Sequence, residues 1–121
     1  MILCYTPSNI DSKKIERRVK LLTDRLMIFF IEEDDIEIIN ESNQKVLRDM
    51  ICLYKPIMFY VDSLKEMDMS QTQICELILF IIKHNCVFQS EKDSLFFESK
   101  DIDKVYLMVY DTFKNKIQKI V

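Results

Sequence analysis

The sequence has no glycine among its 121 residues. Glycine adopts a positive φ angle at the lowest steric cost, so left-handed turns in this chain must be made by residues that carry a Cβ atom. Asn, Asp and Lys are the expected replacements, and such turns are predicted at Asn9, Asn40, Asn85 and Asp93. The same absence excludes a glycine-rich phosphate loop, and no cofactor is expected.

Length and composition fit one domain that spans residues 1–121. The chain is 49% hydrophobic and 31% charged, which suits one apolar core and a well-solvated surface. Its longest apolar runs, LMIFFI at 26–31 and LILFII at 77–82, have about a third of the length that a membrane-spanning helix needs. The first residues lack the features of a secretion signal. We expect a cytoplasmic protein with no membrane partner.

The charge pattern argues against autonomous DNA binding. The net charge is −3, and the lysines are scattered among acidic residues. A domain that binds DNA by itself needs a broad basic face, which this pattern does not supply. No helix-turn-helix domain is expected after the predicted terminal helix.

The four cysteines are predicted to be structural. Cys4, Cys52, Cys75 and Cys86 are widely spaced inside apolar runs and form no CxxC pair. Such residues are expected to be buried, reduced thiols and not zinc ligands. The single histidine, His84, lies near a predicted helix end, where its cationic form is favourable, and is assigned no chemistry.

Short apolar runs alternate with amphipathic segments along the chain. Strands are predicted at 2–6, 27–31, 57–61, 86–89 and 95–98, and segment 36–39 is either a short edge strand or a packed loop. Helices are predicted from Asp11 or Ser12, around 46–51, at 70–84 with a capping box of Ser70 and Gln73, and from Ser99 onward. This order predicts an α/β fold of three layers, with a mostly parallel sheet, helices on both faces and a long C-terminal helix.

Two segments that end predicted strands carry a recognisable pattern. ILCYTPSN at 2–9 contains Tyr5, and FYVDSLKE at 59–66 contains Asp62 and Leu64. With HNCVFQS at 84–90 and the terminal helix, these segments resemble the amino-terminal catalytic domain of the small serine recombinases, the resolvase and invertase family. That family's first strand ends in Tyr-Ala-Arg-Val-Ser, and its third strand runs into Lys-Leu-Asp-Arg-Leu-x-Arg. The resemblance runs over nearly the whole chain.

The resemblance implies a resolvase-like fold and a serine that attacks DNA phosphate. Ser8 is the candidate catalytic residue, while the ungapped alignment places Asn9 at the nucleophile. The family's arginines are replaced by Pro7 after the first strand and by Ser63 and Glu66 after the third. The four arginines that the chain does have are predicted on helices away from the strand ends: Arg17, Arg18, Arg25 and Arg48.

These departures fall on the chemistry of the family. Phosphoryl transfer relies on cations that stabilise charge on the phosphate oxygens. Their loss predicts a catalytically inactive domain, in which Ser8 is a turn or capping hydroxyl. The expected function is that of a dimerising or partner-binding regulatory module linked to DNA recombination.

Two alternatives to this function remain open. Glu32, Glu33 and Asp62 are predicted near the carboxyl ends of strands, where they could hold Mg²⁺ in a phosphoryl-handling enzyme. The other interpretation of these carboxylates is a solvated loop without a metal. A residual recombinase or recombinase accessory subunit that uses Ser8 is the second alternative.

The terminal helix is apolar around more than one face. A helix that covers one side of a sheet needs only a single apolar stripe. The family resemblance implies that this helix forms a dimer, and the alternative is burial within its own domain. We predict a homodimer, or an assembly with another resolvase-like protein, formed by Tyr106, Met108, Val109, Tyr110, Phe113 and Ile117.

Overall fold

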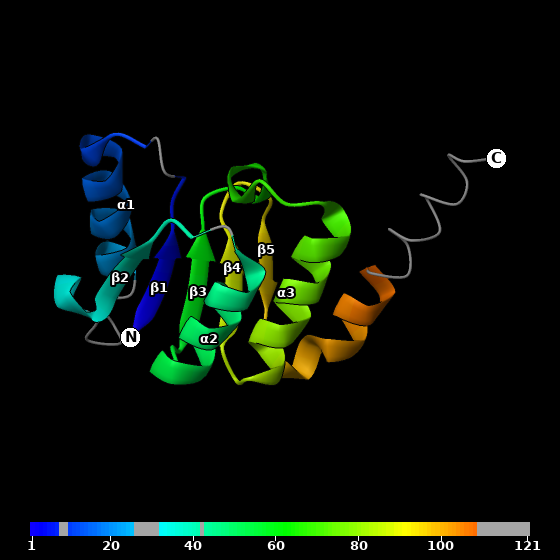
Figure 1. Cartoon of the computed structure of the whole chain (residues 1–121). Coiled ribbons are helices and arrows are strands. Elements are labelled where there is room, and N and C mark those ends of the chain that lie inside the picture. The colour runs from blue at the N-terminus through cyan, green and yellow to red at the C-terminus, as the bar shows by residue number, and fades with distance from the viewer. Residues whose placement is uncertain (8–9, 26–31, 42, 109–121) are drawn as a thin grey trace.

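A computed structural model of the chain describes residues 1–7, 10–25, 32–41 and 43–108 (Figure 1). Its elements are β1 (Ile2–Tyr5), α1 (Ser12–Arg25), η2 (Glu33–Asp35), β2 (Ile36–Ile39), α2 (Gln44–Tyr54), β3 (Met58–Val61), η3 (Leu64–Met67), α3 (Gln71–Lys83), β4 (Val87–Ser90), β5 (Leu95–Phe97) and η4 (Ser99–Asp101), where η denotes a 3₁₀ helix. Residues 102–108 are helical. The predicted strand at 27–31 and the predicted helix beyond residue 108 lie outside the described residues.

Five strands form one sheet in the order β2-β1-β3-β4-β5. β1 is parallel to both of its neighbours, and Ile2 pairs with Ile36 of β2 and with Met58 of β3. β4 is parallel to β3, while β5 is antiparallel to β4. The predicted α/β class and mostly parallel sheet are confirmed. Segment 36–39 is an edge strand and not a packed loop.

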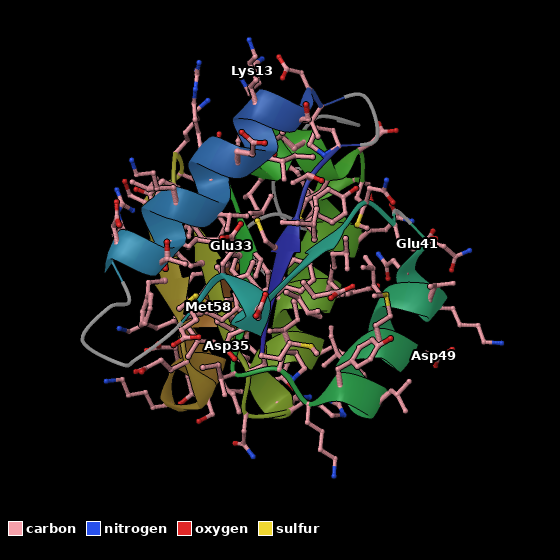
Figure 2. All side chains as sticks on the ribbon, turned by 90° about the vertical axis from the view of Figure 1, so that its left-hand side faces the viewer. Lys13, Glu33, Asp35, Glu41, Asp49 and Met58 are labelled. Carbon is pink, nitrogen blue, oxygen red and sulfur yellow. The ribbon has the colours of Figure 1, made fainter. Side chains whose placement is uncertain are left out.

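Alternating residues of the central strands enter two apolar clusters. Leu3 and Phe59 belong to a cluster built with α2 and α3, and Cys4 and Tyr60 belong to a cluster built with α1. Successive side chains of a strand point to opposite faces, so α1 packs on one face of the sheet and α2 and α3 pack on the other. Figure 2 shows α1 and α2 on opposite sides of β1 and β2.

Left-handed turns occur without glycine, as the sequence requires. The described residues with positive φ are Lys55, Asp68, Asn85 and Ser94. The prediction is confirmed at Asn85 and is wrong at Asn40 and Asp93, while Asn9 lies outside the described residues. At the β4–β5 turn Ser94 takes the positive φ angle, and Asp93 instead accepts hydrogen bonds through its carboxylate.

Local capping explains where the helices begin and end. The predicted capping box is confirmed, because Ser70 Oγ accepts from the Gln73 amide at 3.2 Å and Gln73 Oε1 accepts from the Ser70 amide at 3.1 Å. α2 ends at Tyr54, before Pro56 as predicted. The cap predicted at Ser99 is wrong, because a turn of 3₁₀ helix precedes the α-helical residues and places the cap at Glu98.

Phe59 is the most informative core position for testing this fold. Its side chain is fully buried, and its ring stacks with those of Tyr5 and Phe88 at centroid distances of 6.4 and 6.1 Å. Phe59→Ala is expected to lower the free energy of unfolding by about 4 kcal/mol through lost burial and a residual cavity. Phe96→Ala, on the same sheet but 52% exposed, should cost less than about 1 kcal/mol. Urea titration followed by circular dichroism measures both, and equal losses would contradict the placement of Phe59.

Candidate functional site

The carboxyl ends of β1 and β3 lie side by side in the sheet. Tyr5, the last residue of β1, pairs with Val61, the last residue of β3. The Thr6 amide donates to the Ile39 carbonyl at 2.8 Å, which extends the contact between β1 and β2 by one residue. The two segments that resemble the serine recombinases therefore leave the sheet on the same side, at the carboxyl ends of the strands, which is called the carboxyl edge below. Open α/β sheets bind their ligands at this edge.

Four charged side chains form an ion-pair cluster at this edge: Arg18, Asp62, Glu66 and Lys92. Arg18 Nη1 donates to Glu66 Oε2 at 2.9 Å, and Arg18 Nη2 donates to Glu66 Oε1. Arg18 Nη2 also lies 3.4 Å from Asp62 Oδ2, and Lys92 Nζ lies 3.1 Å from the same oxygen. The side chains of Arg18, Asp62 and Glu66 are only 13%, 16% and 19% exposed. Two cations and two carboxylates thus balance one another.

Two local features bring these side chains together. α1 begins at the carboxyl edge of the sheet, and its buried residues Val19 and Leu22 hold Arg18 close to that edge. After β3, the Ser63 hydroxyl accepts from the Lys65 amide and starts η3, which carries Glu66. The expectation that every arginine lies away from the strand ends is therefore wrong for Arg18. The packing direction of α1, which the sequence does not specify, accounts for the difference.

Burial and the charges at this site together shift the pKa values of Arg18, Cys4 and Tyr60. Burial by itself would lower the pKa of Arg18, but the hydrogen bond that Arg18 donates to Glu66 and the charges of Glu66 and Asp62 outweigh burial and raise that pKa. Burial raises the pKa of the Cys4 thiol to about 12, and Arg18 opposes this rise only in part. The Tyr60 hydroxyl also has a pKa of about 12, because of burial and the nearby carboxylates of Glu91 and Asp62. Cys4 and Tyr60 therefore stay protonated at neutral pH.

Internal pairing leaves little capacity for binding phosphate. A guanidinium recognises phosphate by donating two parallel hydrogen bonds, as it does to a carboxylate. In Arg18, both Nη atoms already donate to Glu66, and Nη2 also faces Asp62. A phosphate at this place would have to displace Glu66 and would lie beside two carboxylates.

The candidate nucleophile Ser8 lies outside the described residues, as does Asn9. The residues on either side are placed. Pro7 is partly buried, and its carbonyl accepts from the Ile10 amide at 3.2 Å.

The carboxylates of the metal hypothesis are not brought together. Glu32 and Glu33 precede β2, whereas Asp62 follows β3. Because β2 and β3 are both parallel to β1, the two groups lie at opposite ends of the strands, separated by about 13 Å along the strand direction for strands of four residues. Figure 2 shows Glu33 and Asp35 well below Lys13, which stands in the first turn of α1. Within the described ranges, no group of three or more His, Cys, Asp or Glu side chains could hold a metal ion.

The carboxylates are separated because the acidic run at residues 32–35 precedes strand β2. The hypothesis assumed that residues 32–35 follow a strand at 27–31, which would have placed them at the carboxyl edge. In the described residues the acidic run leads into β2 and forms η2 beside the amino ends of the strands (Figure 1). These residues match the alternative interpretation, a solvated loop, because Glu32, Glu33 and Asp34 are exposed.

The terminal helical segment is described up to Met108. Tyr106 is 48% exposed, and its hydroxyl accepts from Lys83 Nζ at 2.9 Å. Met108 is partly buried and packs against the cluster formed with α2 and α3. Leu107, which lies within the same apolar helix, is 64% exposed. The other predicted interface residues lie outside the described residues: Val109, Tyr110, Phe113 and Ile117.

A cavity of about 700 Å³ lies between η3, the first turns of α3 and Met108. Its lining is mixed, with apolar side chains from α3 and charged groups that include Lys65 and Asp93. The Asp93 carboxylate accepts from the Ser90 hydroxyl at 2.6 Å and from the Leu64 amide at 2.8 Å, and both bonds lower its pKa. Asp93 therefore ties the β4–β5 turn to η3 at the rim of the cavity.

Cys52 departs from the predicted burial of the cysteines. Cys4, Cys75 and Cys86 are buried, but Cys52 is exposed on the last turn of α2. Its Sγ lies 3.8 Å from His84 Nε2 at the end of α3. No sequence motif joins these two residues, which are 32 positions apart, so sequence reasoning missed the pair.

No protein-family model matches the chain, and no curated protein is significantly similar to it. The resemblance to serine recombinases therefore rests on sequence segments alone: residues 2–9, 59–66 and 84–90 and the predicted terminal helix. Among the helices in the described ranges, none is long and apolar enough to cross a membrane.

Replacing Arg18 tests how strongly the cluster holds this edge together. Arg18→Met should lower the free energy of unfolding by about 2 kcal/mol, because it leaves Asp62 and Glu66 side by side without the shared cation. Arg25→Met is the matched control. It breaks the Arg25–Glu91 ion pair, whose arginine is 47% exposed, and should cost less than about 1 kcal/mol. Urea titration at neutral pH compares the variants, and a larger loss for Arg25→Met would contradict a structural role of the cluster.

Proposed function

We propose that the chain is a resolvase-like module without catalytic activity, which acts by binding a second copy of itself or another resolvase-like protein. The cellular process in which this module would act is linked to DNA recombination. The proposal includes a resolvase-like three-layer arrangement and a C-terminal helix that continues from residues 102–108.

The ion-pair cluster is the observation that carries this proposal. It occupies the edge of the sheet where the resemblance locates phosphate chemistry. Catalysis of phosphoryl transfer needs cations that are free to meet the developing charge on phosphate oxygens. Arg18 is instead committed to Glu66 and Asp62, and Lys92 pairs with Asp62. The cations at this site therefore pair with the carboxylates of the site itself and not with an external phosphate.

The sheet supports the resemblance on which the proposal draws. The matched residues Tyr5 and Asp62 belong to segments that end neighbouring strands, as a shared site requires. The packing of α1 on one face and of α2 and α3 on the other is consistent with three layers.

Exposed apolar side chains near the end of the described chain support a binding role. Tyr106 and Leu107 are 48% and 64% exposed, while the preceding residue, Val105, is fully buried. The segment therefore has one face on the core and apolar groups on another. Burying such groups against a partner removes apolar surface from water.

A DNA cleavage assay tests the absence of catalysis. Supercoiled plasmid incubated with a large excess of the purified chain is expected to stay supercoiled, with no protein attached to DNA. Ser8→Ala should behave as the parent does. Relaxation of the plasmid, or covalent attachment that disappears in Ser8→Ala, would overturn the proposal. An active small serine recombinase in a parallel reaction confirms that the conditions permit cleavage.

Assembly is tested at Leu107. The parent chain is expected to scatter light as a dimer at micromolar concentration, and Leu107→Glu should shift it toward monomer, because burying an unpaired charge is costly. Circular dichroism should remain that of the parent, since Leu107 does not pack in the core. Met108→Glu is less suitable, because Met108 contacts the core cluster.

Asn40→Asp serves as the control for the added charge. Asn40 is exposed after β2, far along the sheet from residues 102–108, and the substitution adds the same single negative charge. This variant should remain dimeric. A parent chain that is monomeric at all concentrations tested, or equal dissociation of both variants, would remove self-association from the proposal.

A further inference from the structure

Cys52 and His84 form a thiol–imidazole pair on the surface, where α2 and α3 end side by side. Cys52 Sγ lies 3.8 Å from His84 Nε2. Both residues are exposed, so small molecules in solvent can reach the sulfur. The pair lies apart from the ion-pair cluster, because α2 and α3 cover the face of the sheet opposite to α1.

The hydrogen bonds of His84 determine which ring nitrogen faces the thiol as a base. His84 Nδ1 lies 2.8 Å from the Phe80 carbonyl oxygen. A carbonyl only accepts, so Nδ1 must carry the hydrogen of that bond. In the neutral ring Nε2 is then unprotonated, and it is the nitrogen that faces Cys52. The imidazole is therefore oriented to accept the thiol proton.

The ends of the two helices make this proton transfer depend on His84. His84 caps the carboxyl end of α3, where the helix dipole stabilises an imidazolium cation. Cys52 lies in the last turn of α2, where the same effect opposes a lone thiolate. The imidazolium that His84 becomes on accepting the proton lies beside the sulfur and offsets this effect.

A second cation lies one helical turn away. Arg48 precedes Cys52 by four residues on α2, so both occupy one face of that helix. Its guanidinium carbon lies 5.2 Å from the centre of the Phe80 ring, which in turn lies 4.1 Å from the His84 ring. In the described part of the chain, Arg48 Nε has no hydrogen-bond partner. Arg48 therefore adds a second positive charge to the face of α2 that carries Cys52.

We propose that Cys52 is a thiol-exchange site that forms a mixed disulfide with a small disulfide, with His84 as its base. The proton moves from Sγ to Nε2, and the thiolate attacks one sulfur of the small disulfide. A new bond joins Cys52 to that sulfur while the original disulfide bond breaks. The departing thiolate takes the proton from His84. Cys52 is oxidised to the mixed disulfide, and the departing half of the small molecule is reduced to a thiol.

The other cysteines provide an internal contrast. Cys4, Cys75 and Cys86 are 0%, 5% and 1% exposed. Burial also raises the pKa of the Cys4 and Cys86 thiols to about 12, which keeps them protonated. One thiol per folded chain should therefore exchange, and the remaining three should react only after unfolding.

The test is the rate at which the reduced, folded chain reacts with dithiobisnitrobenzoate, whose thiol product is coloured. Near neutral pH one equivalent is expected to react rapidly, and Cys52→Ser should abolish that phase. His84→Gln should slow it by about tenfold or more through loss of the base. Lys83→Gln, which removes a positive charge beside His84, is the matched control and should stay within about twofold of the parent. With glutathione disulfide, mass spectrometry should find one glutathione on Cys52.

A second measurement separates proton transfer from simple access to the sulfur. At about pH 10 most of an exposed thiol is ionised without help, so the parent and His84→Gln should react at similar rates. A rapid phase that persists in Cys52→Ser, or equal rates of parent and His84→Gln near neutral pH, would overturn the proposal. A difference that remains at high pH would also overturn it, since His84 would then only control access. A Cys52-linked dimer formed in place of the glutathione adduct would exclude a small disulfide as the partner.

Discussion

The pairing of β1 between β2 and β3 is the constraint on which the rest of the structure depends. All four residues of β1 are buried, and each pairs with a residue on both sides. A strand buried on both faces needs helices above and below it, which α1 on one face and α2 with α3 on the other provide. The central position of β1 also brings its carboxyl end next to that of β3, and this contact creates the edge that holds the ion-pair cluster.

The ion-pair cluster fills the carboxyl end of the sheet with charged side chains that pair with one another. Arg18 could bind a phosphate if its neighbours were neutral or cationic, because the guanidinium geometry suits that ligand. Glu66 and Asp62 instead use the same donor atoms, and Lys92 completes the charge balance. The Arg18–Glu66 ion pair thereby joins α1 to η3. This substitution of an internal partner for an external one is the physical basis of the proposed non-catalytic role.

The absence of glycine has a structural consequence at the ends of the helices. Lys55 caps the carboxyl end of α2 and Asn85 follows the cap of α3, and both residues take the left-handed conformation without glycine. These turns return the chain to β3 and β4, which are adjacent in the sheet. The last turns of the two helices consequently lie together, which brings Cys52 to His84. Neither the ion-pair cluster nor any predicted site residue takes part in this second pair.

The sequence by itself determined the features that depend on neighbouring residues. These are the apolar strands ILCY and MFYV, the capping box of Ser70 and Gln73, and the end of α2 before Pro56. These features follow from side-chain period, local hydrogen bonds and the shape of proline. Only the tertiary structure decided whether segment 36–39 is a strand, because its three isoleucines and Glu37 form a strand when β1 lies beside them to pair with. It also decided that Arg18 meets Asp62 and Glu66 across 44 and 48 positions, and that the acidic run lies away from them. Contacts at such separations depend on strand order and on the direction in which helices pack, and local sequence patterns carry no record of either.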